Sequence, residues 1–306
     1  MSMAQEQLLR YSAAPTSQPQ ILYIMGTGRS GTTILEILLA NNPGVTGVGE
    51  LKNIFRDGFL GNRACACGKK GTECAVWSRV LQSTGWNRND CVRLGQVVAT
   101  LESHRRFPLL FAGLASRRSW TLYREANEGL FGAIVRVTQC RVIVDSSKYA
   151  GRALALARLF PGRVRVLCIT RSAAGLLAAF GKQTEEQRPK GMLGAAAYYV
   201  YALFCIRCVR SLLKQRCFTV RFEDLHRDPD ATLRAIELWS GYSLAASRAR
   251  LSNDRRFDVG HIVSGNRLRK QGTVRFGLNS TETSPPGPAA RLLGTTLEAY
   301  RRMLGF

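Results

Sequence analysis

Short apolar runs alternate with amphipathic stretches along much of the chain. Four runs have the continuous apolar character of strands buried on both faces, at 21–25, 141–145, 164–169 and 217–221. A helical pattern follows each of them, at 31–40, 150–160, 173–180 and 229–239. Because alternating strands and helices build a parallel sheet that helices cover on both faces, the pattern predicts a three-layer α/β fold with ligands at the carboxyl ends of the strands.

The same pattern predicts one domain. Residues 1–19 end in a cluster of Pro, Ser, Thr and Gln that is typical of a flexible tail, and 20–306 then form a single domain. Polar helical sequence at 61–130 interrupts the rhythm and indicates an insertion over one edge of the sheet. The most apolar segment, 192–206, stops at Arg207 before the ~18 residues that a membrane span needs, so it predicts a buried helix.

Charge is the unusual part of the composition. The 306 residues include 44 Lys and Arg against 21 Asp and Glu, a formal net charge of +23, and 36 of the basic residues are Arg. Arginine presents a planar fork of donors that matches phosphate, sulfate and carboxylate, so the excess favours an anionic partner. The alternative is an arginine-rich surface that is merely solvated, and local chemistry has to decide between the two.

Two further features indicate the cytoplasm. The N-terminal segment has Glu and Gln where a secretory signal needs a continuous apolar stretch. The chain has nine cysteines, an odd number spread over predicted helices and strands. That usage fits a reducing compartment better than a disulfide framework.

The segment from Gly26 to Thr33 predicts an anion cradle. It joins the first strand to the first helix, and its glycines let the backbone turn so that the amides at the helix start face one spot. Its spacing matches the phosphate-binding motif G-x-x-x-x-G-K-[ST], except that Thr32 stands where the lysine should be. Arg29 is the cation of this loop. The cradle therefore suits a less charged group than a nucleoside triphosphate, which also needs an acidic residue for Mg²⁺.

Further motifs follow the cradle in a fixed order, at 49–50, 145–148, 169–172, 221–225 and 265–272. Together with 29–33 they make the chain resemble the sulfotransferases that use 3′-phosphoadenosine 5′-phosphosulfate (PAPS), over about 20–60 and 140–275. With Arg29 and Glu50, the chain is similar to the carbohydrate and tyrosylprotein members rather than to the small-phenol enzymes, whose loop carries Lys and whose base is His. The resemblance implies the P-loop nucleotide-hydrolase-like sulfotransferase fold.

The resemblance also implies roles around the 5′ end of the donor. The loop would hold the phosphosulfate through its amides and hydroxyls, which belong to Gly28, Arg29, Ser30, Gly31, Thr32 and Thr33. Arg29 and Lys148 would neutralise the charge that develops on the bridging oxygen and the sulfuryl group. Glu50 would be the base that takes the proton of the acceptor hydroxyl. His261, the one histidine beside a family-like loop, is the rival base.

At the 3′ end of the donor, the resemblance implies an arginine clamp on the phosphate, formed by Arg171, Arg267 and Arg269. The family usually has a serine eight residues after the first of these arginines, and here that position is Ala179. Ser172 or the late basic loop at 265–272 would have to replace it.

Cys65, Cys67 and Cys74 form a separate group, and Cys91 is a conceivable fourth member. Zinc binding, a disulfide and free thiols all stay open, because C-x-C-x6-C is not a standard zinc-finger spacing and no His lies nearby in the sequence. Similar Cys-Gly-Trp stretches occur in bacterial-type sulfotransferases, so the group supports the resemblance without giving a chemistry. No metal is expected for the transfer reaction itself.

The expected function is a PAPS-dependent sulfotransferase that acts on the hydroxyl of a carbohydrate, a lipid-linked glycan or a phenol. The alternatives are a small-molecule kinase of P-loop type, against which Thr32 argues, and a non-enzymatic polyanion-binding protein. No nucleic-acid-binding motif or aromatic-interleaved basic run is present in the sequence, so nucleic acid is not an expected partner. The excess charge leaves open an acceptor that is anionic or membrane-associated, and an enzyme that is peripheral at the membrane.

The acceptor side should be walled by 61–130 and 182–215, since these segments fall outside the donor motifs. They contain an aromatic set that is either core or acceptor contact, namely Trp77, Trp86, Trp120, Tyr198, Tyr199 and Tyr201.

Overall fold

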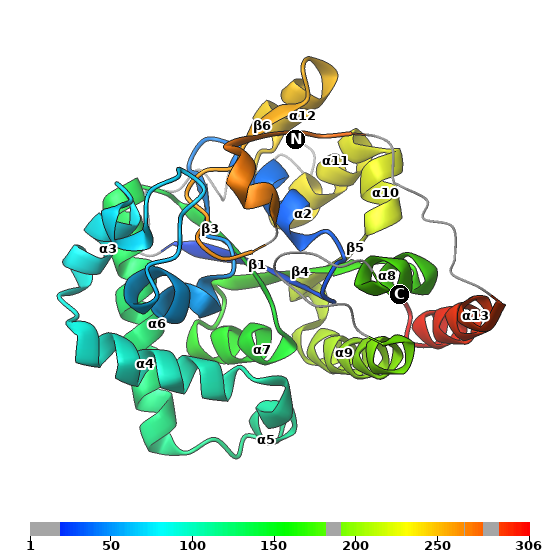
Figure 1. Ribbon diagram of the computed structural model, residues 1–306, viewed down its shortest axis with the longest axis horizontal. Coiled ribbons are helices and arrows are strands. Elements are labelled where there is room, and N and C mark those ends of the chain that lie inside the picture. The colour runs from blue at the N-terminus through cyan, green and yellow to red at the C-terminus, as the bar shows by residue number, and fades with distance from the viewer. Residues whose placement is uncertain (1–18, 182–190, 266, 278–287) are drawn as a thin grey trace, which may run out of the picture.

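A parallel sheet forms the centre of the molecule. The computed structural model describes residues 19–181, 191–265, 267–277 and 288–306. Its main sheet has five strands in the order β2-β3-β1-β4-β5 (Figure 1). They are β1 (Gln20–Gly26), β2 (Val45–Gly47), β3 (Val142–Lys148), β4 (Val164–Thr170) and β5 (Cys217–Arg221), and all neighbours run parallel. The predicted tail at 1–19 lies outside the described residues, apart from Pro19.

The four predicted strands all form. β1, β3 and β4 are buried along most of their length, whereas β5, at the edge of the sheet, is mostly only partly buried. β3 continues three residues past its predicted end at 145, so the 145–148 motif lies within the strand instead of after it. β2 has only three residues, all partly buried, at the edge of the sheet. A strand that short leaves no apolar run of its own in the sequence.

Successive side chains of β1 point to opposite faces of the sheet, and each face is covered by helices. Tyr23 and Met25 belong to one buried cluster, and Leu22 and Ile24 belong to the other. The first cluster packs with α3 (Trp77–Thr84), α4 (Arg88–Leu101), α5 (Phe107–Phe111), α6 (Arg117–Thr138), α7 (Ala150–Leu159), α8 (Ala173–Gly181), α9 (Met192–Leu213) and α13 (Pro288–Met303). The second packs with α2 (Thr32–Ala40), α10 (Phe222–Arg227), α11 (Pro229–Ser240), α12 (Ala245–Ser252) and the ribbon of β6 (Arg256–Asp258) and β7 (Thr273–Arg275). The three-layer prediction is confirmed.

The insertion predicted at 61–130 lies between β2 and β3 and extends further at both ends. Short helical turns start at Leu51, directly after Glu50, and the last helix, α6, ends at Thr138. Figure 1 shows α3, α4 and α6 gathered at one side of the sheet. The first turns of the insertion therefore continue straight from a predicted catalytic residue.

The apolar segment predicted as a buried helix forms α9 and continues to Leu213. By length and hydropathy alone, 192–216 could cross a membrane, and 44% of its most apolar window is buried in the fold. Its buried side chains include Tyr199, Leu203 and Ile206, and the helix packs against β1, α7, α8 and α13. One face of α9 thus packs into the core, while Leu193 and Phe204 are exposed.

A buried ion cluster joins the insertion to the sheet. Arg152 on α7 is 1% exposed, and its Nε lies 2.7 Å from Asp145 Oδ2 on β3. The same guanidinium pairs with Glu102 of the insertion, which also accepts a hydrogen bond from the Tyr123 hydroxyl at 2.8 Å. Because charges in a dry interior are stable only when they are paired, these contacts fix the insertion against β3.

Arg152→Met tests this buried ion cluster, because it leaves the carboxylates of Asp145 and Glu102 buried without the cation that pairs with them. We expect the free energy of unfolding, measured by urea titration, to fall by about 3–5 kcal/mol. The control is Arg124→Met, which breaks the exposed 3.1 Å pair with Glu128 and should cost less than ~1 kcal/mol. Equal losses in the two variants would show that the buried cluster has no special role.

Candidate active site

The loop after β1 forms the predicted cradle. The Ser30 amide and hydroxyl donate to the Thr27 carbonyl at 3.3 and 2.7 Å, which closes the turn ahead of α2. Gly31 has φ 92°, and a Cβ there would lie 2.4 Å from the ring of Phe222. Only glycine fits this position. The turn leaves the first amides of α2 at one spot, which is the geometry of an anion site at a helix N-terminus.

Two long-range contacts hold the loop in place. The Gly28 amide donates to the Tyr198 hydroxyl of α9 at 2.9 Å. Arg171, which directly follows β4, donates from a guanidinium nitrogen to the Arg29 carbonyl at 3.1 Å. The Gly28 amide and the Ser30 hydroxyl are thus engaged within the protein.

Glu50 and Lys148 form an ion pair at the carboxyl ends of neighbouring strands. Lys148 Nζ lies 2.6 Å from Glu50 Oε1, and both side chains are largely buried. Asn53 donates to the other Glu50 oxygen at 3.1 Å. Burial alone would lower the pKa of Lys148, but the charge of Glu50 and its hydrogen bond outweigh burial and raise it above its usual value. The structure therefore brings two residues that the sequence predicts as catalytic into direct contact, with the lysine charged.

Glu36 is a buried carboxyl residue beside the candidate site that the sequence analysis missed. It is fully buried on α2, where its carboxyl group accepts hydrogen bonds from the Gly49 amide and the Ser146 hydroxyl, each at 2.5 Å. Burial raises the pKa of Glu36 to about 8, although both hydrogen bonds oppose the shift. Glu36 thus ties the turn before Glu50 to β3. A lone acidic residue in the otherwise apolar second half of this helix was the signal that could have revealed it.

The late segment packs on the same turn. Gly49 has φ 69°, and a Cβ there would lie 2.6 Å from the Ile262 side chain and 2.7 Å from the Ser264 carbonyl. The Glu50 amide donates to that carbonyl at 3.0 Å. Gly265 then lies beside Thr33, so the late segment spans from Glu50 to the cradle.

The predicted 3′-phosphate clamp is only partly assembled in the structure. Arg171 stacks on Phe222 at 4.3 Å beside the cradle, and burial lowers its pKa. Arg269 is 3% exposed and donates to the Ala64 carbonyl at 2.7 Å, so its described contact is internal. The side chain of Arg267 lies outside the described part of the chain. Ala179 is on α8, which follows Arg171.

A comparison of sequences decides the family, since the sequence pattern of the sulfotransferase family matches residues 19–246. The chain belongs to the sulfotransferase family. Two solved structures share its fold. A sulfotransferase domain from the curacin biosynthetic pathway is 13% identical over 92% of this chain and 98% of its own, with a TM-score of 0.50. One from the Synechococcus PCC 7002 olefin synthase is 16% identical over 96% and 97%, with the same TM-score. No curated protein sequence matches significantly.

His261, the rival base, lies in a different environment in this sulfotransferase. Its Nδ1 is 3.2 Å from Cys74 Sγ and 4.0 Å from Cys65 Sγ. Glu50, in contrast, is paired with Lys148 at the edge of the cradle. His261 therefore lies among the cysteines, apart from the pair of Glu50 and Lys148.

Several rings surround the ion pair of the sulfotransferase. His104 stacks on Tyr149 at 4.4 Å and packs edge-on against Tyr198 at 5.9 Å, and Lys52 Nζ lies 3.8 Å above the Tyr149 ring. These side chains are partly exposed, and so are Trp86, Trp120 and Tyr201, which pack against the core. Trp77 and Tyr199 are core residues. Of the predicted aromatic set, Tyr198 and Tyr201 therefore lie against His104, whereas His104 and Tyr149 were not predicted.

A cavity of about 510 Å³ lies away from the cradle of the sulfotransferase. It is bordered by the end of α2, the edge strand β2 and the segment before the late loop, with Asn41, Thr46, Trp77, Arg250 and His261 among its lining residues. Neither Glu50 nor the loop after β1 lines it.

The buried Glu36 makes the stability of the sulfotransferase depend on pH. The pKa of Glu36 in the folded protein, about 8, lies above its ordinary value of 4.5. Its contribution to the free energy of unfolding is therefore complete below pH 4.5 and is lost as the pH rises through 8. Glu36→Gln should remove this loss, which amounts to at most roughly 1.4 kcal/mol per pH unit. Urea unfolding at pH 5 and pH 8.5 measures it.

The matched control is the exposed Glu73→Gln, which should follow the wild type at both pH values. An unchanged difference between the two pH values in Glu36→Gln would mean that Glu36 titrates normally in the folded protein.

Proposed function

We propose that this sulfotransferase moves a sulfuryl group from PAPS to an acceptor hydroxyl, with Glu50 as the base. The observation that supports this best is the 2.6 Å pair of Glu50 and Lys148 beside an anion cradle. A base must lie where the acceptor oxygen approaches the sulfur, and a cation must lie where the leaving oxygen gains charge. The pair supplies both groups at one point.

The donor would bind across the carboxyl edge of the sheet. Its 5′-phosphosulfate would accept hydrogen bonds from the first amides of α2 and from the hydroxyls of Thr32 and Thr33. Arg29 and Lys148 would be the cations beside it. Its 3′-phosphate would lie toward Arg171, with Arg267 as the second arginine of the clamp. We assign Arg269 a supporting role instead, because its guanidinium is buried against the Ala64 carbonyl.

The transfer would be an in-line displacement at sulfur. The acceptor oxygen bonds to sulfur as the bond from sulfur to the bridging oxygen of the donor breaks, and the electron pair of that bond leaves with 3′-phosphoadenosine 5′-phosphate (PAP). The acceptor proton passes to Glu50. Because Lys148 holds Glu50 in the free enzyme, movement of its ammonium group toward the bridging oxygen would release the carboxylate as a base when the donor binds.

The acceptor would lie against His104, Tyr149 and Tyr198. Partly exposed rings next to the base favour an acceptor that carries a ring, such as a carbohydrate, including a lipid-linked glycan, or a phenol. The net charge of +23 would draw an anionic or membrane-associated acceptor to a cytoplasmic enzyme.

Glu50→Gln and Lys148→Met separate the two proposed roles from donor binding. Each should lower PAP release, measured with PAPS and a panel of phenols and oligosaccharides, by about 10²-fold or more. Glu50→Gln should bind PAP as tightly as the wild type, since Glu50 does not touch the donor.

The control is Glu128→Gln, which removes a carboxylate from an exposed ion pair and should keep full turnover. Wild-type turnover in Glu50→Gln would assign the base to another residue. ATP consumption in place of PAPS consumption would support a kinase instead.

A further inference from the structure

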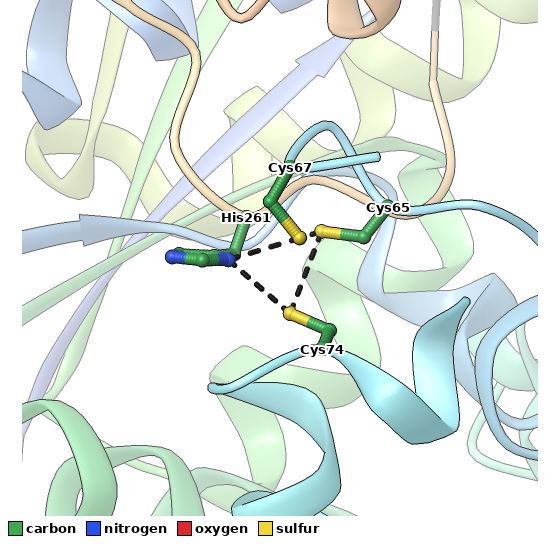
Figure 2. A group of neighbouring side chains, drawn as sticks. All are labelled: Cys65, Cys67, Cys74 and His261. Carbon is green, nitrogen blue, oxygen red and sulfur yellow. Dashed lines mark hydrogen bonds between the residues drawn. The ribbon is translucent and has the colours of Figure 1, made fainter. Parts of the chain in front are cut away.

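Three cysteines and one histidine meet at a point outside the proposed reaction site. Figure 2 shows Cys65 and Cys67 on one turn, Cys74 from the start of the next helical segment, and His261 from the distant segment after β6. Their four ligand atoms all lie within 4.8 Å of one another. The sequence offered Cys91 as a fourth member, but the fold supplies His261, which is 187 positions from Cys74.

The spacing of these atoms is that of a tetrahedral metal site. Cys65 Sγ lies 3.7 Å from Cys74 Sγ, and His261 Nδ1 lies 3.2 Å from Cys74 Sγ and 4.0 Å from Cys65 Sγ. In a tetrahedral zinc site, ordinary bond lengths give edges of about 3.8 Å between sulfurs and about 3.5 Å between sulfur and nitrogen. Because all four ligand atoms lie within 4.8 Å of one another, shifts of about 1 Å or less would bring them to these edges.

We propose that Cys65, Cys67, Cys74 and His261 bind one structural Zn²⁺ ion. Three sulfurs and one imidazole nitrogen are a ligand set that zinc prefers. Because four protein ligands fill the tetrahedron, no position stays open for water or substrate, so the ion would stabilise the fold rather than take part in chemistry. The proposal does not depend on the proposed function.

Backbone hydrogen bonds hold the turn that carries Cys65 and Cys67 in a conformation that suits a metal site. Ala64 pairs with Lys70 in an antiparallel bridge, and the Cys65 amide donates to the Lys69 carbonyl at 2.8 Å. The Cys67 amide donates to Cys65 Sγ, and the Lys69 amide donates to Cys67 Sγ. Hydrogen bonds from backbone amides to sulfur stabilise thiolates and orient them toward a metal ion.

The histidine is fixed equally firmly by neighbouring groups. The buried Trp77 donates from its indole nitrogen to the His261 carbonyl at 2.6 Å, and the Ala66 amide donates to the Ile262 carbonyl at 2.9 Å. The imidazole turns Nδ1 toward the sulfurs and its other nitrogen away from them (Figure 2). The exposed Cys67 and the cavity beside His261 give a metal ion a path to the site.

Charge also fits one divalent ion. Three thiolates and Zn²⁺ leave a net charge of −1, and the exposed Lys69 and Lys70 on the same turn can offset it. A disulfide accounts for less of the arrangement. It needs about 2.05 Å between sulfurs and would leave one cysteine and the imidazole without a role.

The ion would clamp two segments that lie far apart in sequence. The first segment carries Ala64, whose carbonyl accepts a hydrogen bond from Arg269 of the late loop. The second leads to Ser264, whose carbonyl accepts a hydrogen bond from the Glu50 amide. Loss of the metal should therefore loosen the late segment where it packs behind Glu50.

The test is metal analysis of the full chain, expressed and purified under reducing conditions without chelator. We expect one zinc per chain, and tetrahedral thiolate absorption bands after replacement with Co²⁺. Removal of zinc with a chelator should lower the melting temperature, and added Zn²⁺ should restore it.

Variants locate the ligands. Cys67→Ser changes an exposed side chain, so the fold should survive, as circular dichroism would show, while stoichiometric zinc is lost. Cys91→Ser alters a buried cysteine outside the cluster and should retain zinc. A protein that neither contains zinc nor takes it up after reduction would overturn the proposal. So would iron in its place, a Cys65–Cys74 disulfide found by mass, or full zinc in Cys67→Ser.

Discussion

The ion pair of Glu50 and Lys148 is the interaction on which the rest of the site depends. Two opposite charges meet at 2.6 Å because β2 and β3 are parallel neighbours and end at the same edge of the sheet. Glu36 accepts hydrogen bonds from the Gly49 amide and the Ser146 hydroxyl, so it links the turn before Glu50 to the strand that ends in Lys148. The Ser264 carbonyl of the late segment accepts a hydrogen bond from the Glu50 amide.

The order β3-β1-β4 places the donor loop next to this pair. The loop leaves β1 between the two strands that end in Lys148 and Thr170, and Arg171 continues from the second of these. Tyr198 reaches from α9 to the Gly28 amide, which connects the proposed acceptor wall to the donor loop. The proposed function gives the positive charge a local role at Arg29, Lys148 and Arg171, while most of the excess lies elsewhere on the chain.

Sequence patterns were sufficient where a feature is local. The buried strands and the glycine turn with Thr32 in place of lysine follow from neighbouring residues, whereas Glu50 and Lys148 were singled out by the family resemblance. Features that join distant segments were missed. Ser146 and Glu36 are 110 positions apart, Tyr198 and Gly28 are 170 apart, and His261 and Cys74 are 187 apart. No periodicity encodes such pairs, and Arg269 resembled a phosphate ligand until its burial against Ala64 was visible.

The most direct measurement is a crystal structure of the enzyme with PAP bound. We predict the 5′-phosphate on the first amides of α2, with Lys148 Nζ turned from Glu50 to a phosphate oxygen, and the 3′-phosphate beside Arg171. A nucleotide bound away from the cradle, or a phosphate that leaves the Lys148–Glu50 pair intact and out of reach, would contradict the role of this pair in sulfuryl transfer.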